Sequence, residues 1–313
     1  MKNKIKILLS VILFATYPTF SKMVLERNSP AVVTLLTELI TAALLIFIFG
    51  FFPELKKYSK LTRTKGMSAL VGMGVLAGVC GPLFSLIGYS NSAVLNGVLL
   101  ITLQSPIVIL GSAFFLREKI RWNHTLGMIV LIIGLIAYET KFFLVWPQFV
   151  WNDLFFFLSA VAFAASNIIY KKHLSHISHE LVLIIRNLIG GLLIFAGLIL
   201  FSTEGAVRVS FDFQSLTGIG LIVLVPIIIA QSLWYTSLEK VKNSEAAFFD
   251  TLYPLFATLF AFILRHEVVS REQIIGGIIM IVGLMIAQIH WRRMPGEPIL
   301  HRNHVRLQYF KQH

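Results

Sequence analysis

The chain has 313 residues, of which 57% are hydrophobic and only 13% charged, and its mean hydropathy is +0.80. Ordinary soluble domains carry about a quarter charged residues, so this composition excludes a soluble globular protein and indicates a membrane protein. The formal net charge of +12 would also suit a nucleic-acid-binding protein, so the location of the basic residues has to decide between the two.

Ten apolar runs are long enough to cross a bilayer, which needs about 20 consecutive apolar residues in a helix. They cover residues 5–25, 31–52, 67–89, 93–116, 122–140, 150–171, 180–202, 216–238, 244–264 and 272–291. The connections between them are short, and only the tail at 292–313 is long and polar. The sequence therefore predicts one all-α polytopic unit with ten transmembrane helices.

The basic residues favour one side of these helices. If the N-terminus is cytoplasmic, 20 of the 27 Lys and Arg residues fall in cytoplasmic segments and six on the opposite side. Such a bias is the positive-inside rule. It predicts that both termini are cytoplasmic, in the plasma (cell inner) membrane, and that the basic tail lies near anionic headgroups. No nucleic-acid partner is needed to explain the charge.

The two halves of the chain repeat each other. The stretch "FATYPTFSK" at 14–22 returns as "FAASNIIYK" at 163–171, an offset of 149 residues. The same offset makes E-x8-G-x6-G appear twice, with Glu118, Gly127 and Gly134 in the first copy and Glu267, Gly276 and Gly283 in the second. We expect a first repeat over 1–140, a second over 141–291 and a cytoplasmic tail over 292–313. Because five spans per half is an odd number, the second repeat must be inverted in the membrane.

Inverted repeats are typical of secondary transporters, in which two oppositely oriented halves exchange conformations around a central site. A proline followed twelve or thirteen residues later by R-E or R-H-E, then by x8-G-x6-G, resembles the end of an EamA-type repeat of the drug/metabolite transporter superfamily. The resemblance implies a central cavity lined by helices 1, 3, 4, 6, 8 and 9, and members that mostly export amino acids or small metabolites. Such repeats often carry a basic residue in their second helix. Arg186 supplies it in the second half, whereas the first half has Thr37 and Glu38.

Three ionisable residues, Glu38, Arg186 and Asp250, lie well within predicted spans. A charge near the bilayer centre costs about 2.5–3.5 kcal/mol on insertion scales, so such residues usually face the protein interior or a wet cavity. Helices 2 and 7 flank the cavity in the family, which favours structural pairing or snorkelling for Glu38 and Arg186, with coupling as the alternative. Asp250 lies on a predicted cavity helix, which favours a role in solute binding and coupling. Its alternative is a helix-start residue near the headgroups.

Helices 4 and 9 carry matching polar pairs directly before a proline. Thr102 and Ser105 precede Pro106, and Asp250 and Tyr253 precede Pro254. Residues at i and i+3 lie on one face of a helix. Proline frees a backbone carbonyl, which is tolerated in a span where that backbone faces protein or water. Five prolines fall inside the predicted lining helices, at positions 18, 82, 106, 226 and 254. Packing kinks are the alternative explanation for them.

Further solute contacts are predicted on helices 1, 6 and 8. The candidates are Tyr17, Asn167, Gln231 and Trp234. An amide in the membrane needs partners, so interhelical hydrogen bonding is an equal alternative for Asn167 and Gln231. Nearby Tyr170 and Tyr235 are close enough to span ends to be interfacial belt residues.

Two remaining patterns favour structural roles. The glycines seven residues apart permit close helix contact, either within the chain or in a homodimer. The histidines at 173, 176 and 179 lie in a predicted loop without a second ligand cluster, so we expect no metal site.

The sequence also lacks a P-loop and an H-E-x-x-H motif, and we expect neither an enzyme nor a cofactor. A channel would more often show rings of like residues than an inverted repeat. The sequence thus predicts export of a small amphipathic metabolite, with import or exchange as the alternative.

Overall fold

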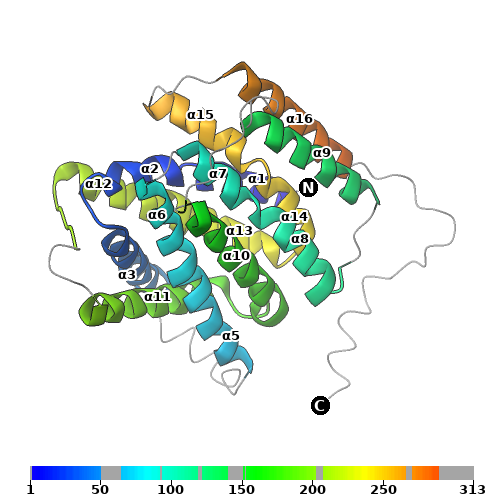
Figure 1. Cartoon of the computed structure of the whole chain (residues 1–313). Helices are drawn as coiled ribbons and strands as arrows, with labels where there is room; N and C mark the ends of the chain where they lie inside the picture. The colour runs from blue at the N-terminus through cyan, green and yellow to red at the C-terminus, as the bar shows by residue number, and fades with distance from the viewer. Residues whose placement is uncertain are drawn as a thin grey trace, which may run out of the picture.

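A computed structural model describes residues 2–50, 65–91, 94–118, 122–139, 151, 153–201, 207–265 and 270–288. The described chain is helical (Figure 1). Seven long helical segments are apolar enough to cross a membrane, and three shorter apolar helices follow at Leu100–Phe115, Trp122–Ala137 and Ile274–Ala287. Each of these ten falls on one of the predicted runs, so the ten-helix fold is confirmed. We number them as spans 1 to 10. The predicted tail at 292–313 lies outside the described residues.

Four spans are single continuous α-helices where the structure describes them. They are α3 (Pro30–Phe49), α9 (Trp122–Glu139), α11 (His179–Phe201) and α16 (Arg271–Gln288), which form spans 2, 5, 7 and 10. Their sequences contain no proline beyond the first helical position, so nothing in them removes an internal backbone hydrogen bond.

The other six spans are interrupted. Span 1 is α1 (Lys2–Phe14) and α2 (Tyr17–Leu25), span 4 is α7 (Val94–Thr102) and α8 (Gln104–Phe115), and span 9 is α14 (Asn243–Asp250) and α15 (Tyr253–Arg265). Spans 3, 6 and 8 contain π-helical turns. Span 3 is α5 (Lys65–Met73), η1 (Gly74–Cys80) and α6 (Gly81–Asn91), span 6 is α10 (Asp153–Ile169) and η2 (Tyr170–Leu174), and span 8 is α12 (Phe213–Ile222), η3 (Val223–Ala230) and α13 (Gln231–Leu238).

The prolines explain most of these interruptions. A proline has no N–H to donate to the carbonyl four residues earlier, and its ring crowds that carbonyl. Pro106 and Pro254 follow the breaks in spans 4 and 9, and Pro18 follows the break in span 1. Pro226 lies inside η3, and Pro82 is the second residue of α6, two residues after η1 ends. π-turns frequently mark functional sites in helices. Span 6 contains a π-turn without a proline, and nothing in its sequence explains it.

The two halves pack in matching pairs, which agrees with a duplicated repeat. In the centre, span 1 packs on span 8 and span 3 packs on span 6, contacts related by a shift of five spans. Spans 4 and 9 pack on each other through α8 and α14. At the periphery α3 lies against α11 and α9 against α16, and Figure 1 shows these two pairs on opposite sides of the interrupted helices.

The repeated glycines hold α9 against α16. A Cβ atom added to Gly134 would lie 2.7 Å from the backbone nitrogen of Met280 and 3.0 Å from the carbonyl oxygen of Gly276. A Cβ atom on Gly127 would lie 2.7 Å from the carbonyl oxygen of Gly283. The backbones therefore approach more closely than any larger residue allows. Of the two alternatives that the sequence left open for these glycines, the structure shows the contact within the chain.

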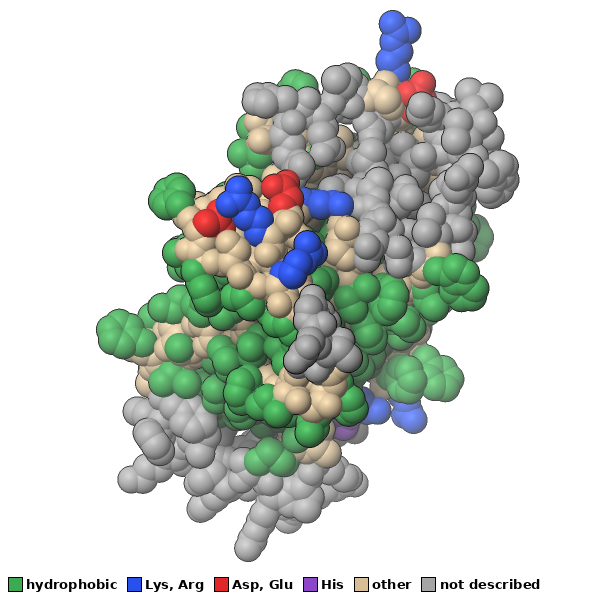
Figure 2. All heavy atoms as spheres, turned by 60° about the vertical axis from the view of Figure 1, so that its left-hand side comes forward, with side chains coloured by type: hydrophobic (Ala, Val, Ile, Leu, Met, Phe, Trp, Pro, Cys, Tyr) green, Lys and Arg blue, Asp and Glu red, His purple; other side chains and the backbone are tan. Residues whose placement is uncertain are grey.

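The outer surface is apolar, as a bilayer requires. Large side chains such as Phe47, Phe114 and Phe201 are at least 79% exposed. In the view of Figure 2, hydrophobic side chains form a broad band, and most of the charged side chains that it shows lie above and below that band. Apolar residues exposed on this scale are typical of a lipid-facing surface rather than of a soluble protein.

Candidate functional site

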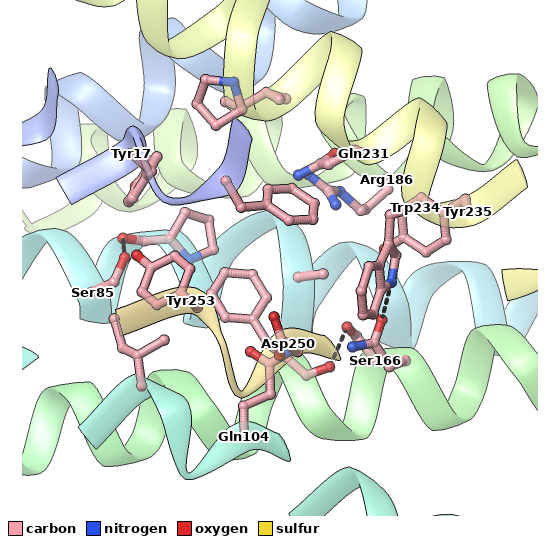
Figure 3. Close-up of a pocket in the computed structure, with 18 of the residues that line it drawn as sticks. Tyr17, Ser85, Gln104, Ser166, Arg186, Gln231, Trp234, Tyr235, Asp250 and Tyr253 are labelled. Atoms are coloured by element: carbon pink, nitrogen blue, oxygen red, sulfur yellow. Dashed lines mark hydrogen bonds between the residues drawn. The ribbon is translucent and has the colours of Figure 1, made fainter. Parts of the chain in front are cut away.

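A central cavity lies where the six interrupted spans meet (Figure 3), and it contains about 1030 Å³ of empty space, including solvent continuous with it. Every one of spans 1, 3, 4, 6, 8 and 9 contributes to its wall, together with one stretch of α3 and one residue of α11. Nine of the ten predicted site residues lie on this wall: Tyr17, Glu38, Thr102, Asn167, Arg186, Gln231, Trp234, Asp250 and Tyr253. A largely apolar cavity with a few converging polar groups is typical of a small-molecule site.

Asp250 is the last residue of α14, at the break in the middle of span 9. This position is not that of a helix-start residue near the headgroups. Its carboxylate Oδ2 accepts a hydrogen bond from the Ser105 hydroxyl at 3.3 Å. Ser105 is fully buried and lies behind Asp250 rather than on the cavity wall. The tenth predicted residue therefore orients the carboxylate and does not face the cavity itself.

Asn167 and Trp234 form a polar contact between spans 6 and 8. The indole Nε1 of Trp234 donates to Oδ1 of Asn167 at 3.3 Å, and both side chains are about 95% buried. The ring of Phe14 packs edge-on against the Trp234 ring, with centroids 6.0 Å apart. Interhelical hydrogen bonding thus explains one of the bonds that the Asn167 amide needs, while both residues still line the cavity.

Gln231 and Thr102 differ in how their polar groups are satisfied. The Oε1 atom of Gln231 is buried and has no hydrogen-bond partner among the described residues. By contrast, the Thr102 hydroxyl donates to the carbonyl oxygen of Val98 at 2.7 Å, within its own helix. A buried acceptor without a partner is costly unless something binds to it. The Gln231 side chain therefore has a hydrogen-bonding site on the cavity wall that no described residue uses.

Glu38 and Arg186 meet at the cavity wall, although their helices were expected only to flank it. Nη2 of Arg186 lies 3.8 Å from Oε1 of Glu38, and both side chains are at most 3% exposed. Nη2 of Arg186 also donates to Oδ1 of Asn187 at 3.1 Å. The other carboxylate oxygen, Glu38 Oε2, and the Arg186 Nε atom have no hydrogen-bond partner among the described residues. The pair combines the structural pairing predicted for these residues with a position on the cavity wall.

Several cavity residues were missed by sequence reasoning. Ser85, Gln104 and Ser166 lie on the wall and are labelled in Figure 3. Gln104 stands between Thr102 and Ser105, on the "TLQSP" segment that contains the break, and Ser166 directly precedes Asn167. Ser85 follows Pro82 by three residues, the spacing of one helix face. The proximity of each to a proline or a predicted residue was the available signal.

The tyrosines assigned to the membrane interface are interior. Tyr170 is fully buried and Tyr235 is 4% exposed, and their ring centroids lie 4.5 Å apart. The belt prediction for them is wrong because their helix faces point to the core. At the start of α11, Nε2 of His179 lies 3.1 Å from Oε1 of Glu180, and its Nδ1 lies 3.7 Å from Oε1 of Glu239.

Comparison with known proteins agrees with this architecture. An uncharacterized transporter of Methanothermobacter thermautotrophicus is 24% identical over 92% of this chain and 85% of its own length. An uncharacterized transporter of Synechocystis sp. is 22% identical over 80% of this chain and 74% of its own length. A solved crystal structure superimposes with a TM-score of 0.71 at 18% identity, covering 92% of this chain and 96% of that one, which shows that the fold is shared.

The family comparison identifies the same duplication as the sequence. Residues 3–138 and 150–288 each match the model of the EamA-like transporter family. The two matches together cover most of the chain, and transport rather than catalysis is the activity of this family. The chain is therefore a membrane transporter of the drug/metabolite transporter superfamily and belongs to the EamA-like transporter family.

Proposed function

We propose that this transporter is a secondary active one that moves a small amphipathic metabolite with an amine, such as an amino acid, by alternating access. Export is the proposed direction, from a cell inner membrane in which both termini are cytoplasmic. The matching halves support this proposal because two related halves can exchange conformations around a shared site. The 20 to six distribution of basic residues supports the orientation.

The observation that carries the substrate class is the Asp250 carboxylate on the wall of a mostly apolar cavity. A carboxylate offers about four lone-pair sites, and the Ser105 hydrogen bond uses one of them. The carboxylate therefore retains acceptor sites for an ammonium group. The Trp234 and Tyr253 rings line the same cavity and suit an apolar body, and aromatic faces also attract cations.

Coupling is proposed to arise from the same carboxylate. A proton and the solute's amine both bind to Asp250, so they compete for one group and exchange across the membrane. Glu38 and Arg186 are the second candidates for coupling, because a buried ion pair at 3.8 Å can be rearranged by a charged solute or by a proton. This mechanism needs no nucleotide, metal or other cofactor.

The test is transport by the purified chain in vesicles, measured for a panel of amino acids and drugs and for the N-acetylated form of each amine. An amine-bearing solute should be transported and its acetylated form should not. The Asp250→Asn variant keeps the shape and removes the charge. A charge-assisted hydrogen bond contributes about 1.5–3 kcal/mol, so solute affinity should fall roughly 10- to 150-fold.

The matched control is Ser105→Ala, which removes the hydrogen bond to Asp250 and keeps the carboxylate. We expect this variant to retain transport of the same solutes with a smaller loss of affinity. Asp250→Asn should either lose transport or transport without a response to pH. Wild-type transport by Asp250→Asn with an unchanged pH profile would refute the assignment and move the search for coupling to Glu38.

A further inference from the structure

The short loop between spans 8 and 9, residues 239–242, is held by two charged side chains from other spans. Glu118 follows α8 and reaches the start of α14, while Lys171 comes from η2 and reaches the end of α13. Both are repeat residues of the sequence: Lys171 corresponds to Lys22, and Glu118 begins the repeated E-x8-G-x6-G motif. Neither residue lines the cavity, so the proposed transport site leaves their contacts unexplained.

Glu118 caps the first turn of α14. Its Oε1 accepts the backbone N–H of Asn243 at 3.0 Å, and its Oε2 accepts the backbone N–H of Ser244 at 3.1 Å and the Ser244 hydroxyl at 2.6 Å. The residue at the N-cap position, Lys242, makes no side-chain capping bond of its own. The first turn of a helix has unpaired N–H groups and a partial positive charge, so a carboxylate there is stabilising.

The backbone before Glu118 is strained in a way that serves this contact. Arg117 has φ = 53°, and the structure describes no other non-glycine residue with positive φ. Residues other than glycine and asparagine are uncommon in this left-handed region, and the surrounding structure must hold such a residue in that conformation. The turn at Arg117 ends α8 and presents the next side chain to α14.

Lys171 makes the complementary contact at the end of α13. Its Nζ donates to the carbonyl oxygens of Leu238 and Val241, the latter at 2.9 Å. The last carbonyls of a helix lack partners and carry partial negative charge, so an ammonium group stabilises them. A carboxylate at one end of the loop and an ammonium at the other thus fix the α13–α14 hairpin relative to spans 4 and 6.

This hairpin extends from the cavity wall to the loop at residues 239–242. The cavity is lined by Gln231 and Trp234 near the start of α13 and by Asp250 at the end of α14. Between them and the loop, Leu238 and Ala246 are fully buried in a core that also contains residues of α1, η2 and α11. A solute that leaves on the side of residues 239–242 has to pass these buried apolar residues.

We propose that Glu118 and Lys171 form a latch that holds the α13–α14 hairpin over the cavity and must release for the solute to pass on that side. The inference rests on the alternating access proposed above. Within the latch, Glu118 and Lys171 are positioning residues that do not touch the solute. They determine the positions of Gln231, Trp234 and Asp250. Breaking either contact favours the conformation that is open on the side of residues 239–242.

The test measures which side of the membrane reaches the cavity. A Ser166→Cys reporter in a Cys80→Ser background is labelled with a membrane-impermeant thiol reagent, in right-side-out and in inverted vesicles. A separate Lys242→Cys protein identifies the face of the loop, because Lys242 is exposed. We expect Glu118→Gln to increase labelling of the reporter from that face about tenfold, equivalent to about 1.4 kcal/mol.

Lys171→Met should act in the same direction, and two matched variants should not. Glu245→Gln also removes a carboxylate from the first turn of α14, where it pairs with Lys4. Lys22→Met removes the repeat counterpart of Lys171 in the first half. Both should change labelling from the loop face by less than twofold. A latch raises labelling from the loop face alone, whereas general loosening raises it from both.

The proposal is overturned if Glu118→Gln and Lys171→Met leave labelling unchanged, raise it from both faces, or match the two control variants. These results are separate from the fate of the proposed function. If the wild type transports the amine-bearing panel while the labelling rates do not respond, the latch is wrong and the transport proposal stands. If labelling responds but no solute of the panel is transported, the latch stands and the substrate class is wrong.

Discussion

The contact between α9 and α16 makes a quantitative prediction about Gly134. In a Gly134→Ala variant the new methyl group would lie 2.7 Å from the backbone nitrogen of Met280 and 3.0 Å from the Gly276 carbonyl oxygen. Backbone atoms cannot rotate away as a side chain can, so the two helices must separate by several tenths of an ångström. Overpacking of this kind costs about 1–3 kcal/mol. The better helix propensity of alanine offsets about 0.5–1 kcal/mol of that cost.

The assay is thermal unfolding of the purified protein in detergent, with Gly197→Ala as the matched control. Nothing lies within 4 Å of a Cβ atom added to Gly197, so that variant should be neutral or stabilised by about 0.5–1 kcal/mol. With roughly 2–4 °C per kcal/mol, Gly134→Ala should unfold several degrees below Gly197→Ala. Equal melting temperatures would refute the close packing, and an altered oligomeric state without lower stability would favour a glycine contact between copies.

Three further predictions concern the site and the topology. Gln231→Ala should weaken transport at normal membrane expression, because it removes a buried acceptor available to the solute; transport like that of the parent would remove Gln231 from the site. Glu38→Gln leaves the buried Arg186 charge unpaired and should destabilise the protein by about 3–5 kcal/mol in thermal or denaturant unfolding, whereas a double variant with Arg186→Met should recover most of the loss. An impermeant thiol reagent added from outside should label Ser270→Cys but not Ser59→Cys, and the reverse pattern would overturn the proposed orientation.

The positions of the spans were readable from the sequence because the bilayer imposes one strong requirement on each. A run of about 20 apolar residues is visible without knowledge of its neighbours. The breaks in spans 4 and 9 were also signalled, because Pro106 and Pro254 remove a hydrogen bond whatever surrounds them. Comparison of the two halves of the sequence also predicted that the chain is a duplicated repeat. Properties of one segment, or of one segment compared with its repeat, were therefore predictable.

The site was predictable only in part, because helix periodicity does not give the rotation of one helix against another. Glu38 and Arg186 were expected to lie beside the cavity, yet α3 and α11 turn this pair onto its wall. The spacing puts Ser105 on the same helix face as Thr102, but the helix is interrupted at residue 103, and Ser105 donates to Asp250 instead of lining the cavity. Tyr170 and Tyr235 stand near the ends of their spans, as the sequence indicated, but the sequence did not show that their side chains point into the protein.

The distribution of interrupted and continuous spans has a consequence for how motion in this protein can be observed. Suppose that the six interrupted spans bend at their interruptions when the cavity opens to the other side of the membrane. Two spin labels on one such span, one on each side of the interruption, should then change their separation when solute binds. The same pair of labels on α11, which runs unbroken from His179 to Phe201, should keep a constant separation. The four continuous helices thus supply control distances that should not change. With them, bending within a span is distinguishable from movement of whole spans, which would alter distances between helices and leave every distance within a helix unchanged.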